Sequence, residues 1–452
     1  MTPHVTRRTG MLVAALLATA LGAKAPERSS DLKFSDTKLK NGLRVIIAED
    51  HNAPVYSIAI SYNVGSRDER KGRTGFAHLF EHMMYKGSEN VGNGEHFTLV
   101  FNNGGNMNGT TNKDRTLYYE TLPANQLDLG LYLEADRMRS LVINQANLDN
   151  QRNAVQEERR IGVDNAAYGK TFEAIDSLAY ANFAYSHSVI GSMADLSAAS
   201  VEDVQQFFKT YYAPNNAVMA IVGDVNTAQT LAAVRKMFEG IPQQPAPPAV
   251  DMTEPAPSGE KRIVLEDALA RAARVDVAYV VPPSSSDDEA ALSVLATVLG
   301  AGRSGRLYEQ LVRQQQVATA TTASHGESRG PGLFQVVVLV PQGKQPAEAE
   351  KAAYDEIEKL KATPPAEWEL DKARTNAERN AVAQQESSLS RAVLLSQYAL
   401  FYNDPGRVNT RVDRIRAVTA ADVQRVAQKY LVANNRSVIT TIPKPASSRG
   451  GF

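Results

Sequence analysis

The stretches SVEDVQQFFKTYYAPNNA (200–217) and TAADVQRVAQKYLVANNR (419–436) decide the fold of this chain. They are identical at six positions, without a gap, at a constant offset of 219 residues. Each begins with Ser or Thr followed three residues later by Asp, a variant of the capping box, and continues with helical periodicity. A strand pattern follows each stretch, VMAIVG in one and SVITTI in the other. A helix, turn and strand repeated at one offset indicate a duplicated domain.

A proline-rich segment separates the two copies. Residues 242–258 contain PQQPAPPAVDMTEPAP, with six prolines in sixteen residues and no regular period, which is typical of a linker. We therefore expect two homologous domains, at about 30–241 and 259–443. Strand and helix patterns are mixed in each, without the strict alternation of a doubly wound sheet. The predicted fold class is α+β, with two duplicated domains that each have a mixed or antiparallel sheet and packed helices.

The composition limits the possible chemistry. The chain has 452 residues, with 49 Lys and Arg against 50 Asp and Glu, and no cysteine. This length suffices for two domains with cores of their own. A net charge of −1 argues against nucleic-acid binding, because there is no basic excess to displace phosphate counterions. Without cysteine, any protein-bound metal must be held by His, Asp or Glu.

The N-terminus is typical of an export signal. Within residues 1–25, Arg7 and Arg8 precede the apolar run MLVAALLATALGA, and small residues follow it. The run is short for a membrane span, and no later stretch stays apolar over about 18 residues. We expect removal of the signal, at a position that the sequence leaves open, and a periplasmic or secreted protein with no membrane span afterwards.

The sharpest chemical feature is the sequence His78-Leu-Phe-Glu81-His82, within a helix predicted over 74–86. A spacing of four residues places both imidazoles on one face of the helix, one turn apart, where they can bind a single ion. Glu81 can reach a water on that ion and take its proton during attack on a carbonyl. This is the reversed zincin order, H-x-x-E-H. A pair of His residues that only packs or caps the helix is the plain structural alternative.

Two His leave a tetrahedral zinc one protein ligand short, because a catalytic site reserves the fourth position for water. The candidate segment is a helix predicted from about 145 to 165, which carries Glu157 and Glu158. Adjacent glutamates point about 100° apart on a helix, so one can face the metal while the other faces solvent. Helical geometry does not choose between them, and both could belong to a solvated charge run beside Arg159 and Arg160.

Four runs of sequence together resemble the inverzincin metallopeptidases of the pitrilysin and insulysin type. They are GSRDERKGRTGFAHLFEHMMYKGS (65–88), GGNMNGTTNKDRTLYYETLP (104–123), LEADRM (133–138) and VQEERR (155–160). The likeness covers nearly the whole mature chain, and the two-domain length resembles the mitochondrial processing peptidase branch. The resemblance implies a zinc endopeptidase that hydrolyses short or unfolded peptides.

The resemblance also implies roles for individual residues. It makes His78 and His82 zinc ligands, Glu81 the general base and Glu158 the third ligand. Many relatives carry an acidic residue seven positions before the third ligand, where this chain has Gln151. Glutamine can still hydrogen-bond a ligand or water next to the metal, so we expect metal binding to survive. A site of two His and one carboxylate also accepts manganese or cobalt.

The segment from Asn108 to Tyr119 resembles the part of the family that leads into a substrate-pairing edge strand. An exposed strand edge offers backbone N–H and C=O groups to an extended peptide of any sequence. By resemblance, Asn108 and Thr110 are the candidate substrate-binding residues. A structural strand with a polar turn is the alternative.

The second domain has no candidate metal ligands at the positions that correspond to the motif. The offset of 219 places the H-x-x-E-H motif near Thr297–Ala301, which contains no ligand residue. Relatives also use an Arg and a Tyr seven residues apart to hold the substrate carbonyl; Arg313 is present here, but Ala320 occupies the Tyr position. The resemblance thus implies the catalytic subunit of a heterodimer whose homologous partner supplies the Arg/Tyr pair. A homodimer is the alternative assembly.

Two other functions stay open at this point: a catalytically silent assembly subunit of the same family, and a zinc hydrolase of non-peptide substrates. Silent relatives usually lose one of the four metal-site residues, which are intact here. The remaining histidines outside the signal, His51, His96, His187 and His325, are expected to be structural or surface residues in polar contexts without a matched carboxylate.

Overall fold

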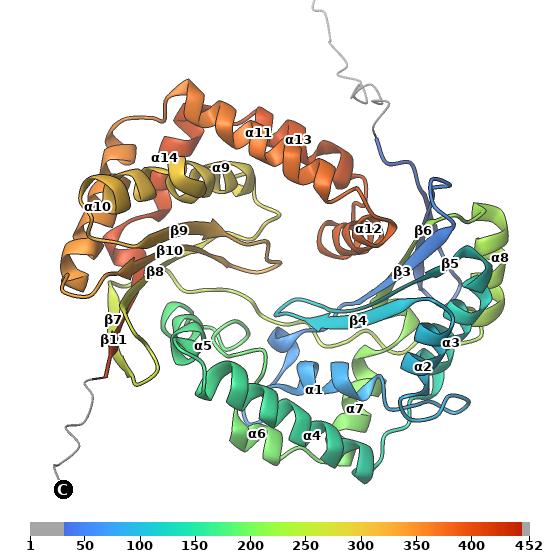
Figure 1. Ribbon diagram of the computed structural model, residues 1–452. Coiled ribbons are helices and arrows are strands. Elements are labelled where there is room, and N and C mark those ends of the chain that lie inside the picture. Colours follow the sequence, from blue (N-terminus) through green and yellow to red (C-terminus); the bar gives the residue numbers. More distant parts are fainter. Residues whose placement is uncertain (1–30, 445–452) are drawn as a thin grey trace, which may run out of the picture. The chain divides into compact units, whose positions relative to one another are not determined.

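The computed structural model describes residues 31–444, so the predicted signal at 1–25 lies outside the described residues. The described chain contains a six-stranded sheet in the order β1-β2-β6-β3-β5-β4 and a five-stranded sheet in the order β7-β11-β8-β10-β9 (Figure 1). Without β1, the two orders are the same. The duplicated α+β fold predicted from the repeat is thereby confirmed. Within residues 31–444, none of the helices combines the length and apolarity needed to cross a bilayer.

Both sheets are mixed. The strands are β1 (Ser35–Lys38), β2 (Arg44–Glu49), β3 (Val55–Tyr62), β4 (Asn106–Thr111), β5 (Thr116–Pro123), β6 (Ala217–Gly223), β7 (Lys261–Asp267), β8 (Ala273–Val281), β9 (Ala320–His325), β10 (Gly332–Val340) and β11 (Arg436–Pro443). In each sheet one pair is parallel, β2 with β6 and β7 with β11, and the other pairs are antiparallel.

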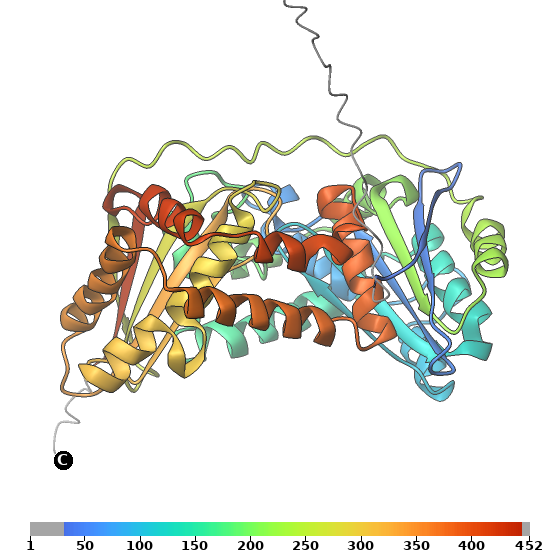
Figure 2. The same cartoon turned by 90° about the horizontal axis from the view of Figure 1, so that it is seen from above.

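Helices cover the sheets and carry the candidate site. They are α1 (Phe76–Met83), α2 (Glu95–Asn102), α3 (Leu127–Ser140), α4 (Gln145–Arg159), α5 (Gly169–Ala179), α6 (Met193–Ser197), α7 (Val201–Tyr211), α8 (Thr227–Phe238), α9 (Glu289–Gly300), α10 (Pro346–Ala362), α11 (Glu367–Ala383), α12 (Ser388–Tyr402), α13 (Arg407–Arg416) and α14 (Ala420–Tyr430). The chain between α8 and β7 contains no helix or strand, and Figure 2 shows it as an extended yellow-green loop.

The first predicted helix is shorter than expected. We expected it over 74–86, whereas α1 begins at Phe76 and ends at Met83. Gly75 precedes it with a φ of 85°, a left-handed conformation that glycine adopts without strain. A residue in this conformation cannot belong to a right-handed helix, so α1 begins after it. The helix predicted to reach about 165 ends as α4 at Arg159 and continues as a π-helical turn.

The repeated stretches form α7 with β6 and α14 with β11, and each helix is capped as predicted. The Ser200 hydroxyl accepts from the Asp203 N–H at 3.1 Å, and the Thr419 hydroxyl from the Asp422 N–H at 3.2 Å. The second bond of the capping box runs from the backbone N–H of the capping residue back to the carboxylate. It is present only in the second copy, between Thr419 and Asp422. In the first copy Arg73 binds the Asp203 carboxylate instead, at 2.9 Å.

The shared asparagines also have one role in both copies. The Asn216 side chain donates to the Tyr211 carbonyl at 2.8 Å, and the Asn435 side chain donates to the Tyr430 carbonyl at 2.9 Å. Each bond ties the turn to the last residue of the preceding helix, so it satisfies a carbonyl that the helix leaves unpaired. The identities in the sequence therefore preserve a helix-to-strand connection.

Each half covers the sheet of the other half with one helix. α12 packs on β3 and β6 of the first sheet, and α5 packs on β11 and β8 of the second. The Ser61 and Ser396 hydroxyls lie 3.0 Å apart in the first contact, and the Thr171 and Thr441 hydroxyls 2.6 Å apart in the second. α5 and α12 begin 219 residues apart, which is the offset of the sequence repeat. The two helices that the halves exchange are therefore equivalent elements of the two copies.

Candidate metal centre

α1 presents its two histidines on one face, as the spacing predicts. The His78 and His82 ring centroids lie 4.8 Å apart, and both side chains are mostly buried. Packing of α1 against α4 places Glu158 beside them, with its Oε2 atom 3.6 Å from His78 Nε2 and 3.5 Å from His82 Nε2. The three candidate ligand atoms lie within 4.8 Å of one another.

The structure separates the two neighbouring glutamates. Glu158 faces the histidines, whereas Glu157 turns away and pairs with Arg160 at 2.9 Å. The two side chains point in different directions because adjacent positions on a helix are about 100° apart. Gln151, about two turns earlier on the same face of α4, interacts with His82.

The electrostatics suit a cation. Burial, with a smaller contribution from His82, lowers the pKa of His78 to about 4. Burial also lowers the pKa of His82, although Glu158 and Gln151 act in the opposite direction. Both rings are therefore neutral near pH 7 and keep a lone pair for a metal. Two neutral imidazoles and one carboxylate are the donor set of a catalytic zinc site that leaves a position for water, so the residues fit the metal.

Glu81 lies next to this group and is held by the edge strand β4. Its Oε2 atom accepts a hydrogen bond from the Thr111 hydroxyl at 2.5 Å. Burial raises the pKa of Glu81 to about 7, and Glu158 acts in the same direction while the Thr111 hydrogen bond opposes it. A carboxylate with such a pKa can both take and return a proton near neutral pH.

Gly109 allows the close approach of α1 to β4. A Cβ atom at this position would lie 3.1 Å from Glu81 Cγ and 2.8 Å from the Tyr85 hydroxyl. Strand alternation puts Gly109 and Thr111 on the same face of β4. Sequence analysis missed Thr111, although the alternation around Gly109 is a signal that could have found it.

The predicted substrate residues lie on the other face of the same strand. Asn108 and Thr110 are exposed. The Asn108 side chain accepts from the Gly109 N–H at 2.8 Å, and the Thr110 hydroxyl accepts from Arg115 at 2.9 Å. β4 is the outer strand of its sheet, and the substrate role of its residues stays a prediction.

A second group of histidine and glutamates is fully buried. His96 Nε2 lies 3.3 Å from Glu120, and Glu134 completes the group. Arg137 binds both carboxylate oxygens of Glu134. Its guanidinium already supplies the positive charge there, so electrostatic repulsion disfavours a divalent cation. We interpret this group as a buried structural network, in which Arg137 and Glu134 form the ion pair and a neutral His96, whose pKa burial lowers to about 3, lies against Glu120.

The expectation that the remaining histidines lack a carboxylate is wrong for three of them. His96 pairs with Glu120 as described above, His51 with Asp224 at 2.6 Å and His187 with Glu69 at 3.0 Å. These partners are 24 to 173 residues away along the chain, so local sequence could not show them. For His51 a nearer carboxylate was visible in the sequence, because Glu49 lies two residues before it and 3.5 Å from its ring.

Up to residue 444, where the described chain ends, the second half contributes no ligand to the group on α1 and α4. Residues 297–301 form the end of α9 and the turn after it. The Arg313 side chain is 65% exposed and binds Glu309 at 3.1 Å, and Ala320 begins the outer strand β9.

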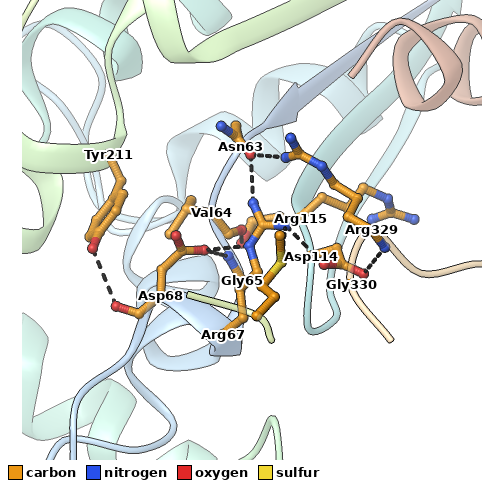
Figure 3. A network of polar contacts seen from close by, with 12 residues as sticks. Asn63, Val64, Gly65, Arg67, Asp68, Asp114, Arg115, Tyr211, Arg329 and Gly330 are labelled. Atoms are coloured by element: carbon orange, nitrogen blue, oxygen red, sulfur yellow. Dashed lines mark hydrogen bonds and ion pairs between the residues drawn. The ribbon is translucent and has the colours of Figure 1, made fainter. Parts of the chain in front are cut away.

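A polar network joins the chain that enters α1 to the second half (Figure 3). Asp114 accepts from Arg67 at 2.9 Å and from the Arg329 backbone N–H at 3.0 Å. Asn63 accepts from both arginine side chains. Because Arg67 lies shortly before α1 and Arg329 lies between β9 and β10, the network anchors the segment that leads into the candidate site.

Two duplicated α+β domains with one H-x-x-E-H site place the chain in the inverzincin class. Residues 44–192, which include His78, His82 and Glu158, match the family described as Insulinase (Peptidase family M16). Residues 198–377 match the family described as Peptidase M16 inactive domain. The chain belongs to the M16 peptidase family, and the predicted resemblance is confirmed.

Named relatives extend over most of the chain. It is 30% identical to the zinc protease PqqE of Helicobacter pylori over 421 residues, which cover 92% of this chain and 95% of the relative. It is 25% identical to a probable mitochondrial-processing peptidase subunit beta of Arabidopsis thaliana, covering 87% of this chain and 76% of the relative. A crystal structure of a protease from Helicobacter pylori superposes with a TM-score of 0.88 at 29% identity, covering 91% of this chain and 100% of that structure.

Proposed function

We propose that the protein is a zinc-dependent endopeptidase that hydrolyses short or unfolded peptides. The observation that carries this proposal is the convergence of His78, His82 and Glu158 from two helices, with the Glu81 carboxylate beside them. The names of the relatives support zinc and proteolysis as properties of the family.

His78, His82 and Glu158 would hold the ion, and its Lewis acidity would activate a water for attack on the scissile carbonyl. Glu81 takes the proton from that water on its carboxylate and returns it to the leaving amine. The Thr111 hydroxyl keeps the Glu81 carboxylate oriented during both transfers. The outer strand β4 offers backbone hydrogen bonds to an extended peptide, with Asn108 and Thr110 beside it.

The proposal extends to assembly and location. The Arg/Tyr pair expected in the family is incomplete here, since Ala320 occupies the Tyr position. We assign the missing pair to a homologous, non-catalytic subunit in a heterodimer, with a homodimer as the alternative. Two relatives are named as beta subunits of a processing peptidase, which supports a partnered chain. The residues typical of an export signal support a periplasmic location.

The test measures cleavage of an unstructured peptide and zinc content together. We expect Glu81→Gln to abolish cleavage while zinc stays bound, because it removes the base and spares the ligands. Glu158→Gln should weaken zinc binding, and Glu157→Gln is its matched control, since that neighbour binds Arg160 instead.

The same assay decides the question of the partner. Cleavage only after addition of a homologous chain encoded nearby would support the heterodimer, and full activity of the chain alone would support the homodimer. Bound zinc without cleavage in every combination would contradict the enzyme and favour the silent assembly subunit.

A further inference from the structure

The start of α1 is held by a buried carboxylate that the proposed chemistry does not use. Glu69 Oε2 accepts from the Gly75 N–H at 2.9 Å, and Oε1 accepts from the Ala77 N–H at 2.8 Å. The first N–H groups of a helix have no partner within it, so Glu69 satisfies them and fixes the residue at which α1 begins. The Glu69 side chain is 0% exposed.

His187 holds that carboxylate in place. Its Nε2 atom lies 3.0 Å from Glu69 Oε2, and its Nδ1 atom lies 2.8 Å from the Phe183 carbonyl oxygen. Both ring nitrogens face oxygen atoms, one of the Glu69 carboxylate and one of the Phe183 carbonyl, so the ring is fixed between two partners. Burial alone would lower the pKa of His187, but the hydrogen bond and charge of Glu69 outweigh it and raise the pKa.

The segment that follows His187 contacts the residues at the start of α1. A Cβ atom at Gly75 would lie 2.6 Å from the Ile190 carbonyl oxygen, so the backbones touch there. Asp195 accepts from the Thr74 N–H at 3.0 Å and from its hydroxyl at 2.5 Å.

This chain also contacts the end of α4. Arg159 donates to the Gly191 carbonyl at 2.8 Å and binds both oxygens of Glu173, at 2.7 and 2.9 Å. Arg159 directly follows Glu158 in the sequence. One segment, residues 183–195, therefore contacts both helices that carry the candidate ligands.

We propose that Glu69 and His187 are positioning residues of the metal centre, which place His78 and His82 opposite Glu158. The inference rests on the proposed zinc site. A shift of the helix start by one residue moves each side chain by about 100° around the axis and about 1.5 Å along it. Metal–ligand distances tolerate only about 0.2 Å, so a loosened start weakens metal binding well before it unfolds the domain.

The experiment measures zinc affinity by competition with a chromogenic chelator, and thermal stability in parallel. The variants are Glu69→Gln, His187→Ala and His187→Gln. The matched control is Glu369→Gln in the metal-free half. Glu369 is also a buried carboxylate at a helix start, where it accepts from the Ala366 N–H at 2.8 Å and pairs with Arg306.

We expect Glu69→Gln and His187→Ala to weaken zinc binding about 10- to 100-fold, as removal of groups that orient metal ligands does. His187→Gln keeps an N–H donor toward Glu69 and should restore affinity close to that of the natural protein. Glu369→Gln should lower the Tm without changing zinc affinity.

Equal zinc affinity of the Glu69→Gln and Glu369→Gln variants would overturn the positioning role. If Glu69→Gln does not fold, the two His187 variants decide the question. Equal losses of zinc affinity in His187→Ala and His187→Gln would also overturn the positioning role. Absence of zinc binding by the natural protein would overturn the proposed function, and this inference with it. Zinc binding by the natural protein that the Glu69 and His187 variants leave unchanged would overturn this inference alone.

Discussion

The contact between Thr111 and Glu81 leads to a prediction at the scale of one residue. Thr111→Val removes the hydroxyl that orients the Glu81 carboxylate while it keeps the shape of the side chain. A hydrogen bond to a charged group contributes about 1.5 kcal/mol or more, so we expect kcat to fall by about tenfold or more. KM and zinc content should stay unchanged.

Thr111→Ser is the control for this change, since it keeps the hydroxyl and loses only a methyl group. Steady-state kinetics on one peptide distinguishes the variants. Equal losses of kcat in the Val and Ser variants would show that packing of the methyl group, and not the hydrogen bond, supports the base.

A second prediction at this scale concerns pH. The folded-state pKa of His187 is raised, so its stabilising contribution is complete below its unfolded pKa of about 6.5 and declines as pH rises through the folded pKa. Glutamine at this position does not titrate. We expect the natural protein to exceed His187→Gln in free energy of unfolding more at pH 6 than at pH 9, as measured by urea denaturation with chelator present. A difference that grows with pH would contradict the ion pair.

The grouping of candidate site residues can be predicted from sequence where their relation is local. His78, Glu81 and His82 lie within one turn and a half of helix, where spacing alone implies a shared face. Glu158 needed the family resemblance, because its helix brings two adjacent glutamates within reach. Thr111 and His187 were missed as site residues, since their partners lie 30 and 118 residues away and only the fold brings them together.

At the scale of elements, the exchanged helices are the main feature that sequence patterns did not reveal. The repeat predicted α7 with β6 and α14 with β11, because helix and strand periods are local. It did not predict that α5 covers the second sheet or that α12 covers the first. An apolar helix face shows that a partner exists, but not which sheet provides it.

The contact of α12 with β3 gives the next prediction. Ser396 is 0% exposed, and its hydroxyl lies 3.0 Å from that of Ser61. Ser396→Ala leaves the buried Ser61 hydroxyl without this partner, which costs about 1–3 kcal/mol of the free energy of unfolding. Ser177→Ala, at an exposed position of α5, is the control and should have little effect. Equal stability of both variants in urea would contradict a tight interface.

At the scale of the whole molecule, the two halves should not fold independently. A fragment of residues 31–241 lacks α12 and exposes the face of β3 and β6 that this helix covers, where Ser57 and Ser61 alternate with apolar residues such as Ala59 and Val222. We expect this fragment to unfold without cooperativity and to aggregate, as exposed apolar sheet surface favours association. Coexpression with residues 259–444 as a separate chain should restore a soluble complex. A cooperative thermal transition of the first fragment alone would contradict this prediction.

The exchange of α5 and α12 also has an evolutionary consequence. Once each copy supplied a helix to the other, loss of either copy would have uncovered the sheet of the survivor. The second copy has no ligand residue at Thr297–Ala301, yet the first sheet still needs its helix α12 as a cover. We therefore regard the duplication as irreversible. We expect substitutions to be tolerated near Thr297–Ala301 and to be opposed where α5 meets β11.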